Sequence, residues 1–184
     1  WQWAAQVGAG GGGGGIAVDS VGNIYVTGGF IGTATFGATN LTSWEHSDIF
    51  IAKLSSSGSW QWAVQVGARG GGGGIAVDSG GNIYVTGVFN ETATFGNTNL
   101  TSSGEFDIFI SKLSSDGSWQ WVIKAGGSFD DYSRGIAVDS ISNVYFTGYF
   151  EKTATFGNTN LTSSGGVDIF ISKCKDGDAC RDTD

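Results

Sequence analysis

Three copies of one unit follow each other along the chain, and this repetition limits the possible folds more than any other feature. Trp3, Trp62 and Trp121 lie at intervals of 59 residues. Three motifs recur in every copy: Gly-Ile-Ala-Val-Asp-Ser from Gly15, Gly74 and Gly135, Thr-Ala-Thr-Phe-Gly from Thr33, Thr92 and Thr153, and Asp-Ile-Phe-Ile from Asp48, Asp107 and Asp168. Residues 1–173 therefore divide into three repeats of about 59 residues (about 1–59, 60–118 and 119–173), and residues 174–184 form an acidic, cysteine-containing tail or linker.

Each repeat is predicted to form short β-strands. In the first copy the candidates are residues 1–7, 15–19, 23–28 and 48–54, of which 15–19 is an apolar run typical of a strand buried on both faces. Gly22 and Asn23 tolerate positive φ and predict a hairpin turn. A further piece from Ala34 to Ser43 is expected to pair at an edge. No segment of ten or more residues has helical periodicity, so the sequence predicts an all-β fold.

The composition indicates a folded chain, and its charge and hydrophobicity argue against some classes of binding partner. Glycine is abundant, with 33 residues, but 40% of the chain is hydrophobic, which is too much for a disordered segment. The net charge is −8, so no basic surface is expected for nucleic acid. No apolar run is long enough for membrane insertion. A chain that starts at Trp1 without a signal peptide is expected to be a mature form or a fragment.

The glycine runs at residues 10–15 and 70–74 invite comparison with a phosphate-binding loop. No Lys-Ser or Lys-Thr pair follows them, and the next predicted element is a strand rather than a helix that could hold an anion at its N-terminus. We therefore expect these runs to be flexible loops between structural units.

The combined motif resembles a known repeat family. Gly-Ile-Ala-Val-Asp-Ser-x-Gly-Asn-Ile-Tyr-Val-Thr-Gly, followed by Asp-Ile-Phe-Ile-x-Lys-Leu-Ser-Ser-x-Gly-Ser-Trp-Gln-Trp, is similar to the bacterial SBBP β-propeller repeat. The resemblance implies tandem four-stranded blades of a β-propeller-like fold in an extracellular or surface-attached bacterial protein, with no single activity and no catalytic residues. The Thr-Ala-Thr-Phe insert makes the unit longer than a typical blade, so a three-fold β-trefoil or β-prism is the alternative fold.

The phase of the repeats bears on assembly. The chain opens with Trp-Gln-Trp, whereas the third copy ends at Lys173 with no Trp-Gln-Trp after it. The first strand is therefore the missing partner of the last, and pairing the two ends would remove exposed sheet edges. Since propellers typically have four to eight blades, two chains could close six blades, copies could stack into a filament, or the chain could be part of a longer array.

Candidate ligand contacts lie mainly where the copies differ. Trp44 and His46 interrupt the repeat pattern and are candidates for an exposed contact. The paired tryptophans of the Trp-Gln-Trp motifs are expected on one side of their strand, either as core or as a platform for sugar rings. The acids that recur in every copy, such as Asp19 and Asp48, are expected to cap turns. An active site usually needs an asymmetric set of residues, so no enzyme activity is expected.

The tail contains a candidate metal site. Four aspartates on a glycine-containing segment, Asp176, Asp178, Asp182 and Asp184, offer the carboxylate oxygens that calcium prefers. Their spacing resembles the calcium repeats of thrombospondin type 3 modules, and Cys174 and Cys180 could close a small disulfide loop. Calcium is thus the candidate cofactor, and a solvated acidic linker is the alternative interpretation.

Together these features predict a non-enzymatic extracellular or cell-surface repeat protein. Its expected role is structural, through self-association into a dimer or filament, or adhesive. The alternatives are a carbohydrate-binding lectin that recognises glycans at repeated sites, and a fragment of a larger secreted protein.

Overall fold

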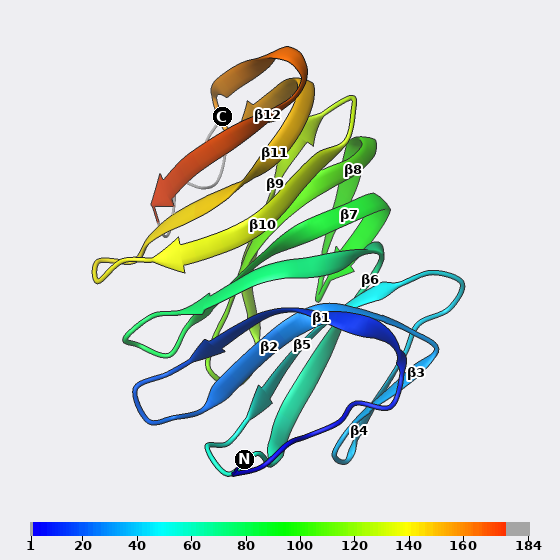
Figure 1. The fold of residues 1–184 in the computed structure, drawn as a ribbon, viewed down its shortest axis with the longest axis vertical. Helices are drawn as coiled ribbons and strands as arrows, with labels where there is room; N and C mark the ends of the chain where they lie inside the picture. Colours follow the sequence, from blue (N-terminus) through cyan, green and yellow to red (C-terminus); the bar gives the residue numbers. More distant parts are fainter. Residues whose placement is uncertain (1, 176–184) are drawn as a thin grey trace.

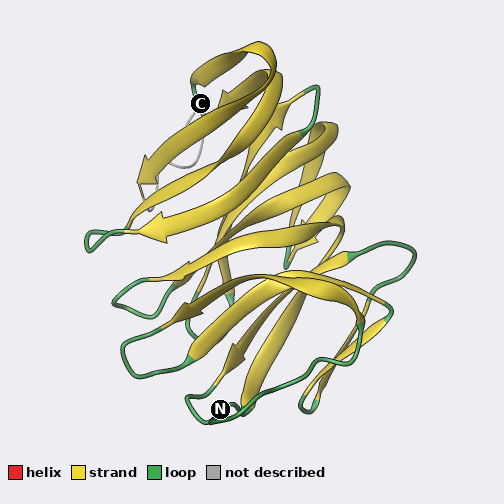
Figure 2. Cartoon of the chain, viewed as in Figure 1, coloured by secondary structure: helices red, strands yellow, loops and turns green. Residues whose placement is uncertain are grey.

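The computed structural model describes residues 2–175, and every regular element in that part of the chain is a β-strand (Figure 2). No helix long and apolar enough to cross a membrane occurs among these residues. The strands are β1 (Gly10–Val18), β2 (Ile24–Ile31), β3 (Thr33–Phe36), β4 (Thr39–Thr42), β5 (Asp48–Leu54), β6 (Trp60–Val77), β7 (Ile83–Phe95), β8 (Thr98–Leu113), β9 (Trp119–Gly127), β10 (Asp131–Val138), β11 (Asn143–Phe156) and β12 (Thr159–Lys175).

The strands form three successive antiparallel layers, which we call blades 1, 2 and 3 (Figure 1). Blade 1 contains β1, β2, β5 and the first half of β6, and blade 2 contains the second half of β6 with β7, β8 and β9. Blade 3 contains β10, β11 and β12. The prediction of β-propeller-like blades is confirmed, and the strands stack as layers rather than as a trefoil or prism.

The glycine runs are strands, so their prediction as flexible loops was wrong. Residues 10–15 lie in β1 and pair with β2, and residues 70–74 lie in β6 and pair with β7. A ladder of backbone hydrogen bonds does not require side chains. The third copy confirms this placement, because Asp131 to Gly135 form the matching part of β10 with ordinary side chains.

A bulge recurs on the first strand of every blade. The pairing register shifts between Gly13 and Gly15, between Gly72 and Gly74, and between Ser133 and Gly135. An extra residue on one strand brings its backbone close to the partner strand. The Thr-Gly pair of each Tyr-x-Thr-Gly motif lies opposite this bulge, which is why glycine occupies that position in all three copies.

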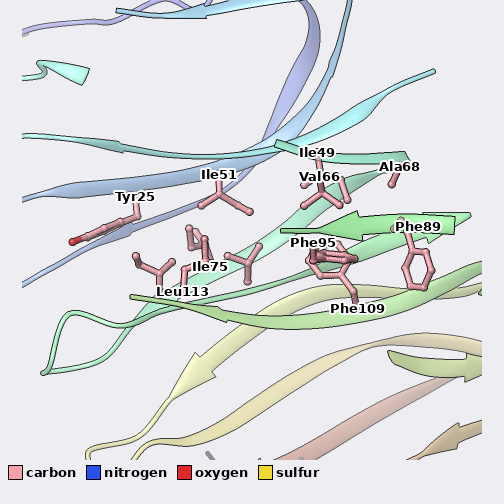
Figure 3. Close-up of a cluster of buried hydrophobic side chains, with 13 residues drawn as sticks. Tyr25, Ile49, Ile51, Val66, Ala68, Ile75, Phe89, Phe95, Phe109 and Leu113 are labelled. Atoms are coloured by element: carbon pink, nitrogen blue, oxygen red, sulfur yellow. The ribbon is translucent and has the colours of Figure 1, made fainter. Parts of the chain in front are cut away.

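The main hydrophobic cores lie between blades. Ile49 and Ile51 of blade 1 pack with Ile75 of blade 2 in one cluster, together with the buried rings of Tyr25 and Phe109 (Figure 3). An equivalent cluster between blades 2 and 3 contains Ile108, Ile110, Phe146 and Phe170. Since burying one such side chain contributes roughly 1.5–3 kcal/mol, these interfaces supply much of the stability. Each blade depends on its neighbour, as in other repeat proteins.

The tryptophans of the second and third Trp-Gln-Trp motifs lie on opposite faces of their sheets, so the expectation that both face one side was wrong for these two motifs. Lys53 pairs with Trp62, but Leu54 pairs with Trp60, which leaves Gln61 as an extra residue in the strand. Trp60 packs edge-on against Phe36 of blade 1, with ring centroids 5.1 Å apart. Trp62 packs against Tyr25 on the other face, at 6.4 Å. The same shift occurs at Trp119 and Trp121, and both interactions are core packing.

The Thr-Ala-Thr-Phe insert, which the sequence predicted to pair at an edge, forms an antiparallel hairpin with the segment that follows it. It is the separate pair β3–β4 in blade 1, and it extends the long strands β7–β8 and β11–β12 in the other blades. The hairpin also reaches the preceding blade: Thr94 pairs with Gly67 of β6, and Ala154 pairs with Gly127 of β9. The insert that lengthens the repeat therefore links neighbouring blades.

An aspartate organises the first hairpin turn of each blade. Asp78 Oδ1 accepts hydrogen bonds from the amides of Gly80 and Asn82, and its Oδ2 accepts them from Asn82 Nδ2 and Tyr84 Oη, all at 2.9–3.1 Å. Asp19 and Asp139 make the equivalent bonds. The side-chain hydrogen bond from Asn143 is the largest of the contributions that lower the pKa of Asp139 to about 2. These carboxylates are ionised turn caps, as the sequence predicted.

Replacing Asp78 by alanine is expected to lower the free energy of unfolding by about 2 kcal/mol, because four hydrogen bonds to one charged group are lost. Urea denaturation measures this change. Ser79→Ala, at the exposed neighbouring position, is the control and should change stability by less than about 0.5 kcal/mol. Equal stability of the two variants would show that the turn holds without its aspartate.

Candidate interaction surface

Blade 3 exposes a face that is buried in the other two blades. Ile169 and Ile171 on β12 are 80% and 81% exposed, whereas the matching Ile49 and Ile51 of blade 1 are fully buried. The half-buried rings of Tyr132, Tyr145 and Tyr149 lie on the same side of the sheet, which follows from the cross-strand pairs Tyr132–Tyr149 and Tyr149–Ile169. We call this surface the C-terminal face.

Blade 1 exposes the complementary surface at the other end of the chain. Ile16 and Val18 on β1 are 70% and 58% exposed, whereas the matching Ile75 of blade 2 is buried against blade 1. We call this surface, formed by Ile16 and Val18, the N-terminal face. Figure 1 shows β1 near the N-terminal end of the stack and β12 at the opposite end. Exposed apolar faces of this kind mark interaction sites.

The outer edge of β12 is a second open feature of blade 3. In blades 1 and 2, β5 and β8 each pair with a following strand that begins at a Trp-Gln-Trp motif. In the described residues β12 pairs with β11 alone. An unpaired edge presents free backbone donors and acceptors that can bind another strand.

A pocket of about 550 Å³ lies on the C-terminal face. The rings of Tyr132 and Tyr149 stack in it, with centroids 5.0 Å apart and planes inclined by 21°. Acidic and aliphatic side chains complete the lining: Asp130, Glu151, Val167, Asp168 and Ile169. Aromatic rings flanked by carboxylates can contact the apolar faces of a ligand and accept hydrogen bonds from it.

Residues 2–28 and 61–88 match the family model described as SBBP, a beta-propeller repeat. Two segments of the chain are thus similar to a propeller repeat. It is 33% identical over 91 residues to an uncharacterized WD repeat-containing protein, L264, of Acanthamoeba polyphaga mimivirus, which covers 44% of this chain and 7% of that protein. It is 28% identical over 151 residues to the regulatory protein FlaEY of Caulobacter vibrioides, which covers 77% of this chain and 16% of that protein. The chain thus spans less than a fifth of the length of either relative.

The SBBP matches agree with the observed blades. The first match ends at Gly28, in β2, and the second ends at Val88, in the equivalent strand β7. Each match starts at the glutamine of a Trp-Gln-Trp segment and covers the inner strand and the first part of the strand after it. The repeat as a sequence unit therefore starts one strand before the blade as a structural unit, which is why blade 3 lacks a fourth strand within the described residues.

Two buried carboxylates meet at the junction of blades 2 and 3. Asp107 on β8 and Asp131 on β10 are both fully buried. A Cβ added at Gly126 would lie 2.8 Å from Asp107 Oδ1 and 2.9 Å from Asp131 Oδ2, so both oxygens approach one point. Lys124 Nζ lies 3.4 Å from Asp107 Oδ2. Asp107 Oδ1 has no hydrogen-bond partner among the described residues.

The junction of blades 1 and 2 explains this orphaned oxygen. There the amide of Ala68 donates to Asp48 Oδ1 at 3.1 Å. At the next junction the matching amide, that of Gly127, donates instead to Asp131 Oδ2 at 2.6 Å. The second copy has Gly70 where the third has Asp131, so only the later junction contains the competing carboxylate. Burial is the main cause that raises the pKa of Asp131, to about 6, and the nearby Asp107 and Asp130 raise it further.

The site residues predicted from the sequence have different outcomes. Trp44 and His46 lie on the exposed segment between β4 and β5, outside the C-terminal face, and their role as ligand contacts stays a prediction. Cys174 lies in β12. Cys180 and the predicted calcium ligands Asp176, Asp178, Asp182 and Asp184 lie outside the described residues, so the disulfide and the calcium site also stay predictions.

Sequence reasoning missed the residues that distinguish blade 3. Asp131, Tyr132 and Tyr149 belong to the C-terminal face or the buried junction. A signal was present, because residues 126–135 of the third copy carry charged and aromatic side chains where the other copies have glycine runs. Only the pairing of β10 with β11 and the stacking of the blades place them together.

Proposed function

We propose that this chain is a non-enzymatic extracellular or cell-surface module with a structural role, and that it acts through self-association. The observation that carries the proposal is the exposure of the C-terminal face, whose isoleucines are the same side chains that hold the blades together inside the chain. The N-terminal face supports it, since it repeats the other half of the same contact. Adhesion to other surfaces would use the same module.

Light scattering of the purified chain tests this proposal. We expect a native mass at least twice the 19.0 kDa of one chain, because leaving these faces in water costs roughly 1.5–3 kcal/mol for each large apolar side chain. Negative-stain imaging of the same sample would separate discrete particles from filaments. A folded monomer at micromolar concentration would contradict self-association.

Carbohydrate binding is a second candidate, which the stacked Tyr132 and Tyr149 favour. The lining carboxylates could accept hydrogen bonds from sugar hydroxyls. This candidate gains weight if the chain is monomeric, because the pocket is then open to solvent. Glycan-array binding that is lost in Tyr149→Ala but retained in Trp44→Ala would assign it to the pocket, and the reverse result would assign it to the segment between β4 and β5.

A further inference from the structure

Two contacts inside the chain define how one blade packs on the next. Ile75 of β6 packs against Ile49 and Ile51 of the preceding blade. Ile136 of β10 packs in the same way against the cluster that contains Ile108 and Ile110. The contact therefore consists of an inner-strand isoleucine from one blade and the Ile-Phe-Ile segment of the blade before it.

Both halves of a third contact are present and uncovered. The C-terminal face offers Ile169 and Ile171, and the N-terminal face offers Ile16 and Val18. All four side chains are more than half exposed, although their counterparts in the two internal contacts are buried or partly buried. At Ile169 and Ile171 the C-terminal face repeats the surface that packs inside the chain, whereas Tyr132 and Tyr149 replace Gly71 and Val88 of blade 2.

The edge of β12 has a matching strand in the chain. Residues 2–9 carry the outer-strand sequence that pairs with β5 and β8 in its other two copies, yet they form no strand here. The internal pairs Ala52–Ala63 and Ser111–Val122 predict by alignment that Ser172 pairs with Ala4. The alignment thus sets the register of the missing strand.

An aromatic contact points to the same partner. Tyr25 packs against Trp62 and Tyr84 packs against Trp121, each tryptophan coming from the outer strand. Tyr145 occupies the equivalent position in blade 3. Lys173 Nζ lies 5.3 Å from the centroid of its ring, but among the described residues no aromatic ring packs against it. The tryptophan that completes the pattern is Trp3, which is partly exposed in the free chain.

Building on the self-association proposed above, we propose that residues 2–7 of a second copy form the fourth strand of blade 3, while the N-terminal face of that copy covers the C-terminal face. The exchange is reciprocal and closes two chains into a six-bladed ring. Figure 1 places β1 and β12 in the blades at opposite ends of the stack, which favours exchange between chains over closure within one. Two copies are also the smallest number that reaches the four to eight blades of known propellers.

Cysteine cross-linking tests the register. One preparation carries Ala4→Cys, another carries Ser172→Cys, and both carry Cys174→Ser and Cys180→Ser so that only the introduced thiols can pair. After mixing and mild oxidation we expect a covalent dimer of the two variants, because the predicted register places these residues opposite each other. Ala9→Cys mixed with Ser172→Cys is the control and should remain unlinked, since Ala9 lies five residues further along the chain.

A surface variant tests the face contact. Ile171→Lys places a charge in the centre of the C-terminal face and is expected to reduce the native mass from two chains to one. Ile141→Lys is the matched control, because Ile141 is 76% exposed at a turn, and it should leave the dimer intact. Circular dichroism would confirm that both variants keep their sheet content.

The outcomes separate this inference from the proposed function. A mass of two chains with the cross-link supports both. A dimer without the cross-link overturns the strand exchange, and a dimer that survives Ile171→Lys overturns the face contact. Both results leave self-association standing. Long polymers overturn the closed ring but not self-assembly. A monomer overturns both proposals.

Discussion

Gly87→Ala is expected to lower the free energy of unfolding by about 3 kcal/mol or more. This is a large effect for a substitution that adds one methyl group and removes no contact. Gly87 lies on β7 opposite the bulge of β6. A Cβ at this position would overlap the carbonyl oxygen of Gly71 and lie 2.8 Å from Phe109 Cε1, inside the core. Neither group can move away, because the Gly71 carbonyl belongs to paired backbone and the Phe109 ring is fully buried.

The matched control for this prediction is Gly165→Ala. Gly165 is exposed, its φ lies outside the left-handed region, and a Cβ there would meet nothing within 4 Å. We expect its free energy of unfolding to change by less than about 0.5 kcal/mol. Urea denaturation of both variants gives the comparison. If Gly87→Ala unfolds at the same urea concentration as the unmodified chain, the bulge does not bring β6 as close to β7 as described.

The second large effect concerns Asp131. The structure predicts that Asp131 makes the chain less stable as pH rises from about 4 to about 6. Burial is the main cause that raises the pKa of this carboxyl from 3.8 to about 6, and the negative charges of Asp107 and Asp130 raise it further. The hydrogen bonds from the amides of Gly127 and Glu151 lower this pKa but do not offset the increase. The folded chain therefore binds a proton in this range that the unfolded chain has released. As pH rises, the free energy of unfolding falls wherever the folded state binds more protons than the unfolded state. For Asp131 the total decrease is up to about 3 kcal/mol.

Other aspartates act in the opposite direction, so the effect must be measured as a difference. Hydrogen bonds lower the pKa of Asp78, although burial opposes them, and its contribution to stability is lost as the pH falls. The quantity to compare is thus the free energy of unfolding of the unmodified chain minus that of Asp131→Asn, measured from pH 4 to pH 8. We expect this difference to become more negative as pH rises from 4 to 8.

Glu45→Gln controls for the removal of a negative charge. Glu45 lies on the exposed segment between β4 and β5, and its substitution should leave the pH profile unchanged within about 0.5 kcal/mol. If Asp131→Asn and Glu45→Gln give parallel profiles, the buried pair of Asp107 and Asp131 is not a source of pH dependence.

The buried pair of Asp107 and Asp131 shows what a local sequence pattern can predict and what it cannot. Asp107 recurs in every copy, and the sequence predicted that it would support a turn. Its Oδ2 does accept a hydrogen bond from the Ser103 amide at 2.8 Å. Its orphaned Oδ1, however, arises because Asp131 of the next blade takes the amide that serves Asp48 at the first junction. Residues from separate strands and separate repeats meet there, which no local pattern contains.

The sequence by itself determined the all-β class, the grouping into repeats and the strands predicted at residues 23–28 and 48–54 of the first copy. It could do so because the alternation of apolar residues and the turn residues, such as Gly22 and Asn23, act within a few residues of each other. The absence of a Trp-Gln-Trp segment after Lys173 in the 184 residues can also be read from the sequence, since counting repeats needs no coordinates.

The tertiary structure alone decided which face each side chain occupies. Trp60 and Trp62 lie on opposite faces because one extra residue between them changes the alternation, and that bulge exists only in the pairing with β5. The glycine runs are strands because β2 and β7 hold them by backbone hydrogen bonds that their composition does not reveal. The exposure of Ile169 and Ile171, identical in sequence to buried residues of blades 1 and 2, depends on whether another blade follows. These properties come from contacts between segments far apart in the chain, and the burial of a side chain is a property of what packs against it.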